Sequence, residues 1–236
     1  MERPNAWKTY KKADLKKVEQ TAAEYRRFLD NGKTERECAK ETVEMLEKAG
    51  YVSLQSAIDA GKKLKPGDKV YLNQMGKAVL IFLMGKKPLE AGMNIVGAHI
   101  DSPRLDLKQN PLYEDNDFAM ADTHYYGGVK KYQWVARELA LHGVVAKKDG
   151  TVVNISIGEK EDDPVVGITD LLIHLSQEQM KKTLGEAISG EKLDVMMGGR
   201  PLADEEKEPV KAGLLKILKD DYGIDWKSPQ EYNEEN

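Results

Sequence analysis

The stretch from residue 94 to residue 103, NIVGAHIDSP, decides how the fold of this chain is interpreted. The apolar run from Met93 to Ala98 predicts a β-strand, and Ser102-Pro103 ends it. Side chains at positions i and i+2 of a strand point to the same side, so His99 and Asp101 would share a face. That geometry suits a metal-binding imidazole whose second ring nitrogen contacts a carboxylate. The alternative is a hydrogen-bonded pair at a strand end that holds no metal.

Two amphipathic helices are expected before this strand. Thr34 and Glu37 form a capping box, which predicts the start of a helix that ends at Gly50. An earlier helix is predicted to end at Asn31-Gly32. Its apolar stripe has three- and four-residue spacing and consists of Leu15, Val18, Ala22, Tyr25 and Leu29. We expect both helices to cover a sheet and neither to carry chemistry.

A hairpin is expected between these helices and the strand at residues 93–98. Residues 69–72 and 78–84 flank a five-residue loop that contains Gly76. The second of these strands is apolar without alternation, which predicts burial of both faces. Helices, hairpin and buried strand together predict part of an α/β sandwich. Ligands of such sheets bind at the carboxyl ends of the strands, where His99 falls.

The pattern of apolar and polar residues changes after Pro103. Alternation at residues 105–108 predicts a half-solvated antiparallel strand, and residues 147–150 form a strong hairpin signal. We therefore divide the chain into one domain at residues 1–103 and a mostly β domain at residues 104–236. The second domain is expected to end in a helix at residues 209–221 and a polar, linker-like tail.

Composition excludes several classes of protein. The chain has 236 residues, a net charge of −4 and 32% charged residues, which gives no basic footprint for nucleic acid. It contains no apolar run of membrane-spanning length and no hydrophobic leader at Met1, so no membrane partner is expected. The single cysteine, Cys38, excludes an internal disulfide and is expected to be a small core residue of a helix. A cytoplasmic location follows as the expectation.

Three blocks of sequence resemble one known family. His-Ile-Asp-Ser-Pro at residues 99–103 resembles the His-Thr-Asp-Ser-Pro signature of the aspartyl aminopeptidase and aminopeptidase I family of zinc metallopeptidases. Residues 126–143, which begin Tyr-Gly-Gly, and residues 170–175, which contain Ile-His-Leu, are similar to two later segments of that family. Ile100 stands where the family usually has Thr, and Val129 replaces a third Gly.

The resemblance implies a fold and an activity. The fold would be the N-terminal half of an α/β zinc-aminopeptidase catalytic domain plus a mostly β dimerisation domain that forms a homo-oligomer. The activity would be removal of N-terminal residues from peptides at a site with two zinc ions. His99 would bind one zinc and Asp101 would orient its ring. His174 would act in trans, reaching across the dimer into the neighbouring active site.

The resemblance also implies that most of the metal ligands are missing. Family members are about twice as long, and their bridging Asp, paired Glu residues, further acidic ligand and last His lie in the other half. Glu205-Glu206 and Glu234-Glu235 lie in polar runs and are expected to be solvated surface instead. Because each zinc needs about four ligands, the isolated chain is expected to bind zinc poorly and to be inactive. The partner it would need is a C-terminal half.

Other interpretations stay open at this point. The chain could be a non-catalytic assembly or dimerisation module, or one half of a split enzyme. A generic α+β binding domain is disfavoured because the three blocks occur in the family's order. His174 could instead be a partly buried histidine at a helix or strand end, while His124 and His142 are expected at the surface or in turns. Cobalt or manganese could replace zinc, and the preferred N-terminal residue of the substrate is not fixed.

Overall fold

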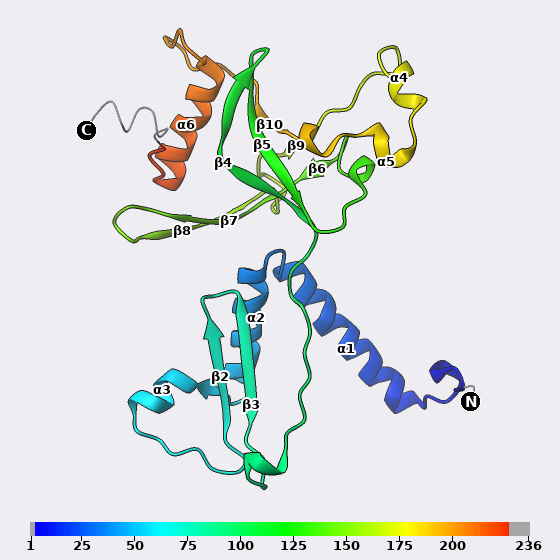
Figure 1. Ribbon diagram of the computed structural model, residues 1–236, viewed down its shortest axis with the longest axis vertical. Coiled ribbons are helices and arrows are strands. Elements are labelled where there is room, and N and C mark those ends of the chain that lie inside the picture. The colour runs from blue at the N-terminus through cyan, green and yellow to red at the C-terminus, as the bar shows by residue number, and fades with distance from the viewer. Residues whose placement is uncertain (1–2, 227–236) are drawn as a thin grey trace. The chain divides into compact units, whose positions relative to one another are not determined.

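The computed structural model describes residues 3–226. The chain folds as two compact units, Met1–Ser102 and Pro103–Asn236, and each unit is described by itself (Figure 1). The predicted linker-like tail and its Glu234-Glu235 pair lie outside the described residues.

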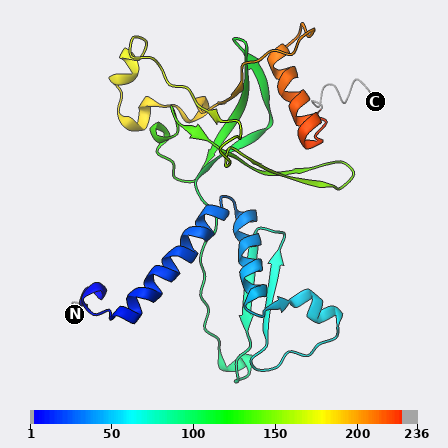
Figure 2. The same ribbon diagram turned by 180° about the vertical axis from the view of Figure 1, so that it is seen from behind.

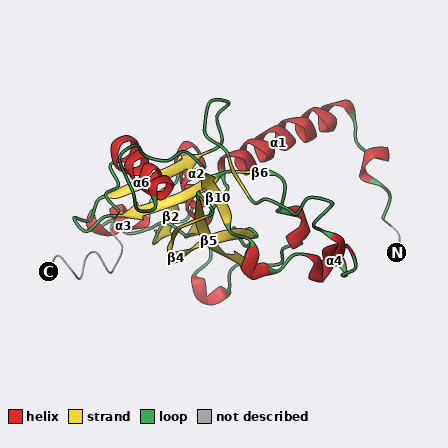
Figure 3. Cartoon of the chain, turned by 90° about the horizontal axis from the view of Figure 1, so that it is seen from above, coloured by secondary structure: helices red, strands yellow, loops and turns green. Residues whose placement is uncertain are grey.

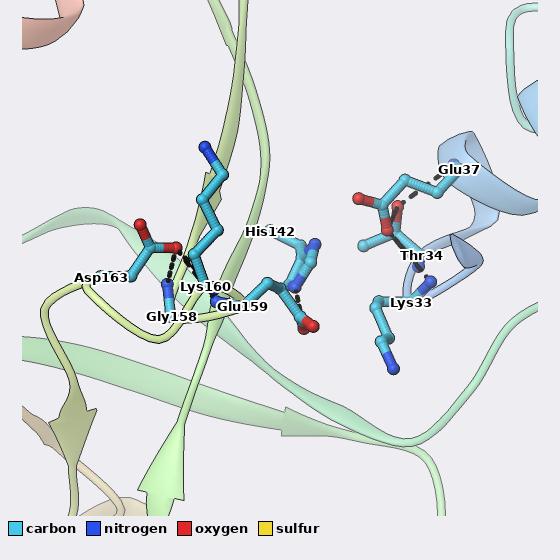
Figure 4. Close-up of polar contacts among 8 residues, drawn as sticks. All are labelled: Lys33, Thr34, Glu37, His142, Gly158, Glu159, Lys160 and Asp163. Carbon is cyan, nitrogen blue, oxygen red and sulfur yellow. Dashed lines mark hydrogen bonds and ion pairs between the residues drawn. The ribbon is translucent and has the colours of Figure 1, made fainter. Parts of the chain in front are cut away.

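Both predicted N-terminal helices are present. After a short 3-10 turn, η1 (Ala6–Lys8), the chain forms α1 (Lys12–Asn31) and α2 (Glu35–Lys48). The capping box at the start of α2 is formed as predicted (Figure 4): the backbone N–H of Glu37 donates to the Thr34 hydroxyl oxygen at 3.3 Å, and the Glu37 carboxylate accepts from the backbone N–H of Thr34 at 3.0 Å. These two hydrogen bonds satisfy N–H groups that have no partner within the helix.

Of the two helices expected to cover the sheet of the first unit, α2 packs on it, whereas α1 packs on α2. Helix α2 contacts β2 (Lys69–Gln74) and β3 (Ala78–Leu83). Cys38 lies in the buried face of α2 as a free thiol, which confirms the core role expected for it. Burial raises the pKa of this thiol, and the nearby carboxylates of Glu37 and Glu35 raise it further.

The first unit contains a three-stranded sheet in the order β1-β2-β3. Strand β1 (Val52–Ser53) pairs with β2 in parallel, and β2 pairs with β3 in antiparallel register from Lys69↔Leu83 to Gln74↔Ala78. The predicted hairpin is therefore confirmed. Helix α3 (Leu54–Asp59) was not anticipated, because its six residues are too few to give a periodic pattern.

Two expectations for this sheet are wrong. The residues of β3 are not buried, since all are exposed except the half-buried Val79 even though α2 contacts the strand. Residues 93–98 form no strand (Figure 1). After the 3-10 turn η2 (Leu89–Ala91) the chain continues without strand pairing, and the side chains of Ile95 and Val96 are 81% and 95% exposed. The physical reason is that no strand within residues 3–226 pairs with this segment, so its strand-forming sequence has no ladder to join.

The second unit is built on an antiparallel sheet in the order β4-β5-β10-β9-β6. Its strands are β4 (Arg104–Asp115), β5 (Phe118–Tyr126), β6 (Glu138–Leu139), β9 (Val166–Gly167) and β10 (Val195–Gly198). The alternation at residues 105–108 is thus confirmed as part of β4. One cluster of buried apolar side chains forms the core, namely Ala121, Val166, Ile168, Leu193 and Val195.

The second predicted hairpin is also present. Strands β7 (Leu141–Ala146) and β8 (Val152–Ile157) pair from Leu141↔Ile157 to Ala146↔Val152 and project from the rest of the unit (Figure 2). Gly150 adopts a φ of 85° in the turn between them, a conformation that glycine enters without steric cost.

The helices of the second unit are α4 (Gln177–Met180), α5 (Leu184–Ala187) and α6 (Pro209–Tyr222), with 3-10 turns η3 (Lys131–Gln133) and η4 (Gly190–Lys192). Helix α6 confirms the predicted last helix and packs on β4, β5 and β10, on the opposite side of the unit from α4 (Figures 1 and 3). The Glu114 carboxylate accepts the backbone N–H groups of Val210 and Lys211 at 2.9 and 2.8 Å, which stabilises the helix N-terminus.

A network of polar groups joins β4, β5 and the chain before β10. The Thr123 hydroxyl donates to the backbone carbonyl of Leu193 at 2.6 Å, and the Tyr113 hydroxyl donates to the Asp194 carboxylate at 2.7 Å. Burial and the neighbouring carboxylate raise the pKa of Tyr113 well above its ordinary value, so the phenol remains a donor at neutral pH. This network stabilises β4, the edge strand of the sheet, which begins at Arg104, a few residues after His99.

The capping box gives a prediction for the first unit. We expect Thr34→Ala to lower the free energy of unfolding by about 1 kcal/mol, because it removes the acceptor for the Glu37 N–H. The matched control is Thr21→Ala, an exposed position inside α1 where alanine favours the helix. Urea denaturation followed by circular dichroism measures both, and equal effects of the two variants would contradict the capping role.

Candidate functional site

His99 and Asp101 lie together, as the sequence predicted. The Nδ1 atom of His99 is 3.0 Å from the backbone carbonyl oxygen of Asp101 and 3.4 Å from a carboxylate oxygen of the same residue. Both acceptors favour the tautomer with the proton on Nδ1, which leaves the lone pair of the neutral ring on Nε2. Metal-binding histidines are commonly held in this way, with one nitrogen donating to a carbonyl or carboxylate and the other bound to the metal.

The two residues are two positions apart in the sequence, and this spacing brings them into contact without a strand. The segment that carries them is not part of a sheet, yet the i, i+2 spacing still brings the ring of His99 to Asp101. The His99 side chain is 85% exposed, so solvent and other polypeptides can reach the imidazole. The arrangement places one oriented imidazole on an exposed surface.

Residues 3–226 do not complete a metal site around this ligand. Within this part of the chain, no group of three or more His, Cys, Asp or Glu side chains is placed to hold a metal ion. Zinc sites in proteins use about four ligands, with three from the protein even where one position is open. The donors present therefore do not fit a zinc ion by themselves, and no chemical step can be assigned to this chain alone.

His174 lies in the second unit, on an exposed turn directly before α4. The alternative of a partly buried histidine is therefore wrong. The turn is well defined: the Ser176 hydroxyl donates to the carbonyl of Ile173 at 3.1 Å, and the Asp170 carboxylate accepts from the Gln179 side chain at 2.9 Å. The residues around His174 on this turn are apolar and exposed, namely Leu171, Leu172, Ile173 and Leu175.

One of the two adjacent glycines, Gly127, lies where another part of the chain passes close to its backbone. Gly127 has a φ of 75°, and a Cβ atom there would lie 3.6 Å from Cα of Pro103. Next to this contact, the guanidinium of Arg104 lies 4.1 Å from the centre of the Tyr126 ring. The end of β5 is thus packed against the residues that directly follow the His-Ile-Asp-Ser stretch.

Of the other two histidines, His124 is at the surface as expected, whereas His142 is largely buried on a strand, so the expectation is wrong for His142. His124 is exposed on β5, and its ring stacks on Tyr125. His142 is on β7, only 11% exposed, with Nε2 2.9 Å from the carboxylate of Glu159 (Figure 4). Sequence reasoning missed this pair because its members are 17 residues apart and meet only through the hairpin register.

Glu159 is held in place by a tight turn. The Asp163 carboxylate accepts the backbone N–H groups of Gly158, Glu159 and Lys160 at 3.0 to 3.1 Å (Figure 4). These hydrogen bonds, led by that from Lys160, lower the pKa of Asp163, so the turn keeps its charged acceptor at neutral pH. The arrangement explains the His142–Glu159 pair as part of the hairpin's structure.

A pocket of about 540 Å³ lies in the second unit beside the turn that carries His174. It is lined by apolar residues and by charges of both signs, among them Asp170, Glu178, Lys182 and Lys192. The pocket was not predicted from the sequence, because its walls come from irregular segments and very short helices.

No helix within residues 3–226 has the length and hydrophobicity to cross a membrane.

Comparison with known proteins identifies the relatives of this chain. Residues 28–231 match the family model of the aminopeptidase I zinc metalloproteases, M18. A probable M18 family aminopeptidase 1 of Clostridium acetobutylicum is 52% identical over 221 residues, which is 93% of this chain and 48% of the relative. The crystal structure of an M18 aminopeptidase from Thermotoga maritima superposes with a TM-score of 0.86 at 44% identity, covering 95% of this chain and 48% of that one.

A more distant solved structure, the mApe1 dodecamer of S. cerevisiae, shares the fold with a TM-score of 0.60 at 20% identity. The chain spans about half the length of the curated relatives it matches. The family model covers most of the chain, including His99, Asp101 and His174, and the mixed α/β fold agrees with the solved relatives. On these findings, the chain belongs to the M18 family of aminopeptidase I zinc metalloproteases.

Proposed function

We propose that this chain is part of a zinc-dependent aminopeptidase that removes N-terminal residues from peptides. The observation that carries the proposal is the contact of His99 with Asp101 at 3.0 and 3.4 Å inside a segment matched by the family model. His99 would bind a metal through Nε2, and Asp101 would orient the ring and keep its tautomer.

The complete site would contain two zinc ions, and this chain supplies one of their ligands. The further ligands would come from a polypeptide that corresponds to the half of the relatives outside the matched region. Two metals together require several more donors than one imidazole. The isolated chain is therefore proposed to be inactive.

The two units would have different roles. Residues 1–103 would be part of the catalytic domain, and residues 104–236 would form a dimerisation domain in a homo-oligomer. The exposed apolar turn around His174 supports the second role, because a second copy that buried Leu172 and Ile173 would carry His174 to a neighbouring protomer. The reduced, buried thiol of Cys38 agrees with a cytoplasmic location.

A non-catalytic assembly module is the second candidate. Within the described residues, the exposed turn at 171–175 and the lack of a three-ligand cluster favour it. Such a module would associate with further copies but would support no hydrolysis when the rest of the enzyme is supplied.

Joining this chain to the remainder of the C. acetobutylicum relative tests the proposed role of His99. With zinc added, we expect the joined protein to hydrolyse aminoacyl-p-nitroanilides. His99→Ala should lower kcat/KM at least ~10³-fold, because the remaining ligands cannot replace an imidazole bound to zinc. Asp101→Asn should weaken zinc binding roughly 10–100-fold.

The control for these variants is His124→Ala, which removes an exposed histidine that belongs to neither proposed role. It should leave kcat/KM unchanged. If His99→Ala retained the activity of the unaltered protein, or if the joined protein had no activity with any substrate or metal, the aminopeptidase role would be rejected.

The role of His174 in trans can be tested in the same joined protein. Protomers carrying His99→Ala and protomers carrying His174→Ala should each be inactive as homodimers. Random mixing should restore about a quarter of the activity, because half of the dimers are mixed and each has one complete site. If the mixture stayed inactive while chromatography showed mixed dimers, His174 would not act across the dimer.

A further inference from the structure

The pocket beside the turn at residues 171–175 is lined by residues of the second unit alone. Its walls come from the chain before α4, from α4 and α5 themselves, and from the chain that leads through η4 (Figure 1). Its volume of about 540 Å³ lies within the range of small-ligand sites in proteins. Such sites combine apolar surface with a few polar groups that select the ligand.

The apolar part of the lining is anchored to the core of the unit. It consists of Val135, Leu171, Leu175, Ala187 and Ile188. Val135 and Ile188 are partly buried and pack against the core cluster, so this wall is held in place without a ligand. Leu171 and Leu175 are 53% and 69% exposed, and they present apolar surface that a ligand would remove from water. The ligand should therefore carry an apolar group.

The acidic part of the lining already has hydrogen-bond donors. Three acidic side chains line the pocket, namely Asp170, Glu178 and Glu186. The first accepts from the side-chain amide of Gln179 at 2.9 Å, and the second pairs with the ammonium group of Lys181. The third accepts from the hydroxyl of Thr183 at 2.9 Å. The negative charges of the lining are thus each matched by a donor of the protein.

The two lysines of the lining have no such partner. Within residues 3–226, neither the ammonium group of Lys182 nor that of Lys192 forms a hydrogen bond or an ion pair. Because an ammonium group has three donors and no acceptor, the group that the pocket lacks is a negatively charged acceptor. A carboxylate suits this role better than a phosphate, since the acids of the lining repel a doubly charged ligand more strongly.

We propose that this pocket is a binding site for the α-carboxylate of an apolar amino-acid residue. The carboxylate would accept from Lys182 and Lys192, and the apolar side chain would cover Leu171 and Leu175. The acids of the lining have further lone pairs for the N–H group beside the carboxylate, which a fatty acid does not offer. Two sources supply this chemistry, a free amino acid and the carboxyl end of a peptide. The inference concerns the second unit alone and does not depend on the proposed metal site.

Binding would also act on the turn that carries His174. Leu171 and Leu175 lie on either side of His174 in the sequence, and both line the pocket. A ligand in contact with these two side chains would restrict the motion of the turn between them. We therefore expect hydrogen exchange of the amides at residues 171–175 to slow at least ~3-fold when the pocket is occupied.

Calorimetric titration of the full chain tests the proposal. Leucine represents the free amino acid, and N-acetyl-leucine represents the carboxyl end of a peptide. We expect at least one of them to bind with a Kd of about 1 mM or tighter. Three probes should bind at least ~10-fold more weakly: leucinamide, which lacks the carboxylate, 4-methylpentanoate, which lacks the nitrogen, and inorganic phosphate.

Substitution of the two lysines locates the ligand. Lys182→Gln and Lys192→Gln each remove one ammonium group and should raise the Kd of the better ligand about 10-fold, because a charge-assisted hydrogen bond is lost. Both residues are exposed, so the variants should keep the melting temperature of the unaltered chain. Lys207→Gln, at an exposed lysine of the second unit that does not line the pocket, is the matched control and should leave the Kd unchanged.

Each outcome supports or overturns the assignment of the pocket. Tighter binding of leucine supports it with a free amino acid as the ligand, and tighter binding of N-acetyl-leucine supports it with the end of a peptide. If neither binds with a Kd below ~20 mM, or if both lysine variants bind as the unaltered chain does, the assignment is wrong. Equal or tighter binding of leucinamide, 4-methylpentanoate or phosphate would also overturn it, because an amino-acid carboxylate would not be the group recognised.

Discussion

The structure of the first unit depends on a requirement of backbone hydrogen bonding. A chain segment with strand-forming residues needs partners for its N–H and C=O groups, and no strand in the described part of the chain pairs with residues 93–98. The side chains of β3 are also largely exposed, although α2 contacts this strand. Because His99 directly follows this segment, its surroundings depend on whatever comes to lie beside residues 93–98.

The proposed metal site has two kinds of component: a contact between neighbouring residues, and ligands that lie elsewhere. The contact between His99 and Asp101 joins residues two positions apart, and it exists although the segment that carries them is not a strand. Under the proposed function, the other metal ligands would come from outside residues 3–226, where no three-ligand cluster exists. The contact with Asp101 orients the imidazole of His99. Under the proposed function, the ring would bind a metal ion only when other donors are brought to Nε2.

Features set by neighbouring residues could be predicted from the sequence. The capping box at Thr34, both hairpins and helix α6 depend on short-range hydrogen bonds, turn residues and periodicity, and all were confirmed. Features that depend on contacts between residues far apart in the sequence could not be predicted from it. The exposure of β3 and the absence of a strand at residues 93–98 depend on neighbours that are not part of the local sequence. The His142–Glu159 pair needs the hairpin register, and α3 is too short to show a period.

The most direct test of the central claim is the zinc content of the chain, measured by elemental analysis alone and in complex with the unmatched half of the C. acetobutylicum relative. The account predicts no stoichiometric zinc on the isolated chain, because one imidazole cannot hold the metal, and about two zinc ions in each complex. Stoichiometric zinc on the chain alone, or a stable complex that binds none, would contradict it.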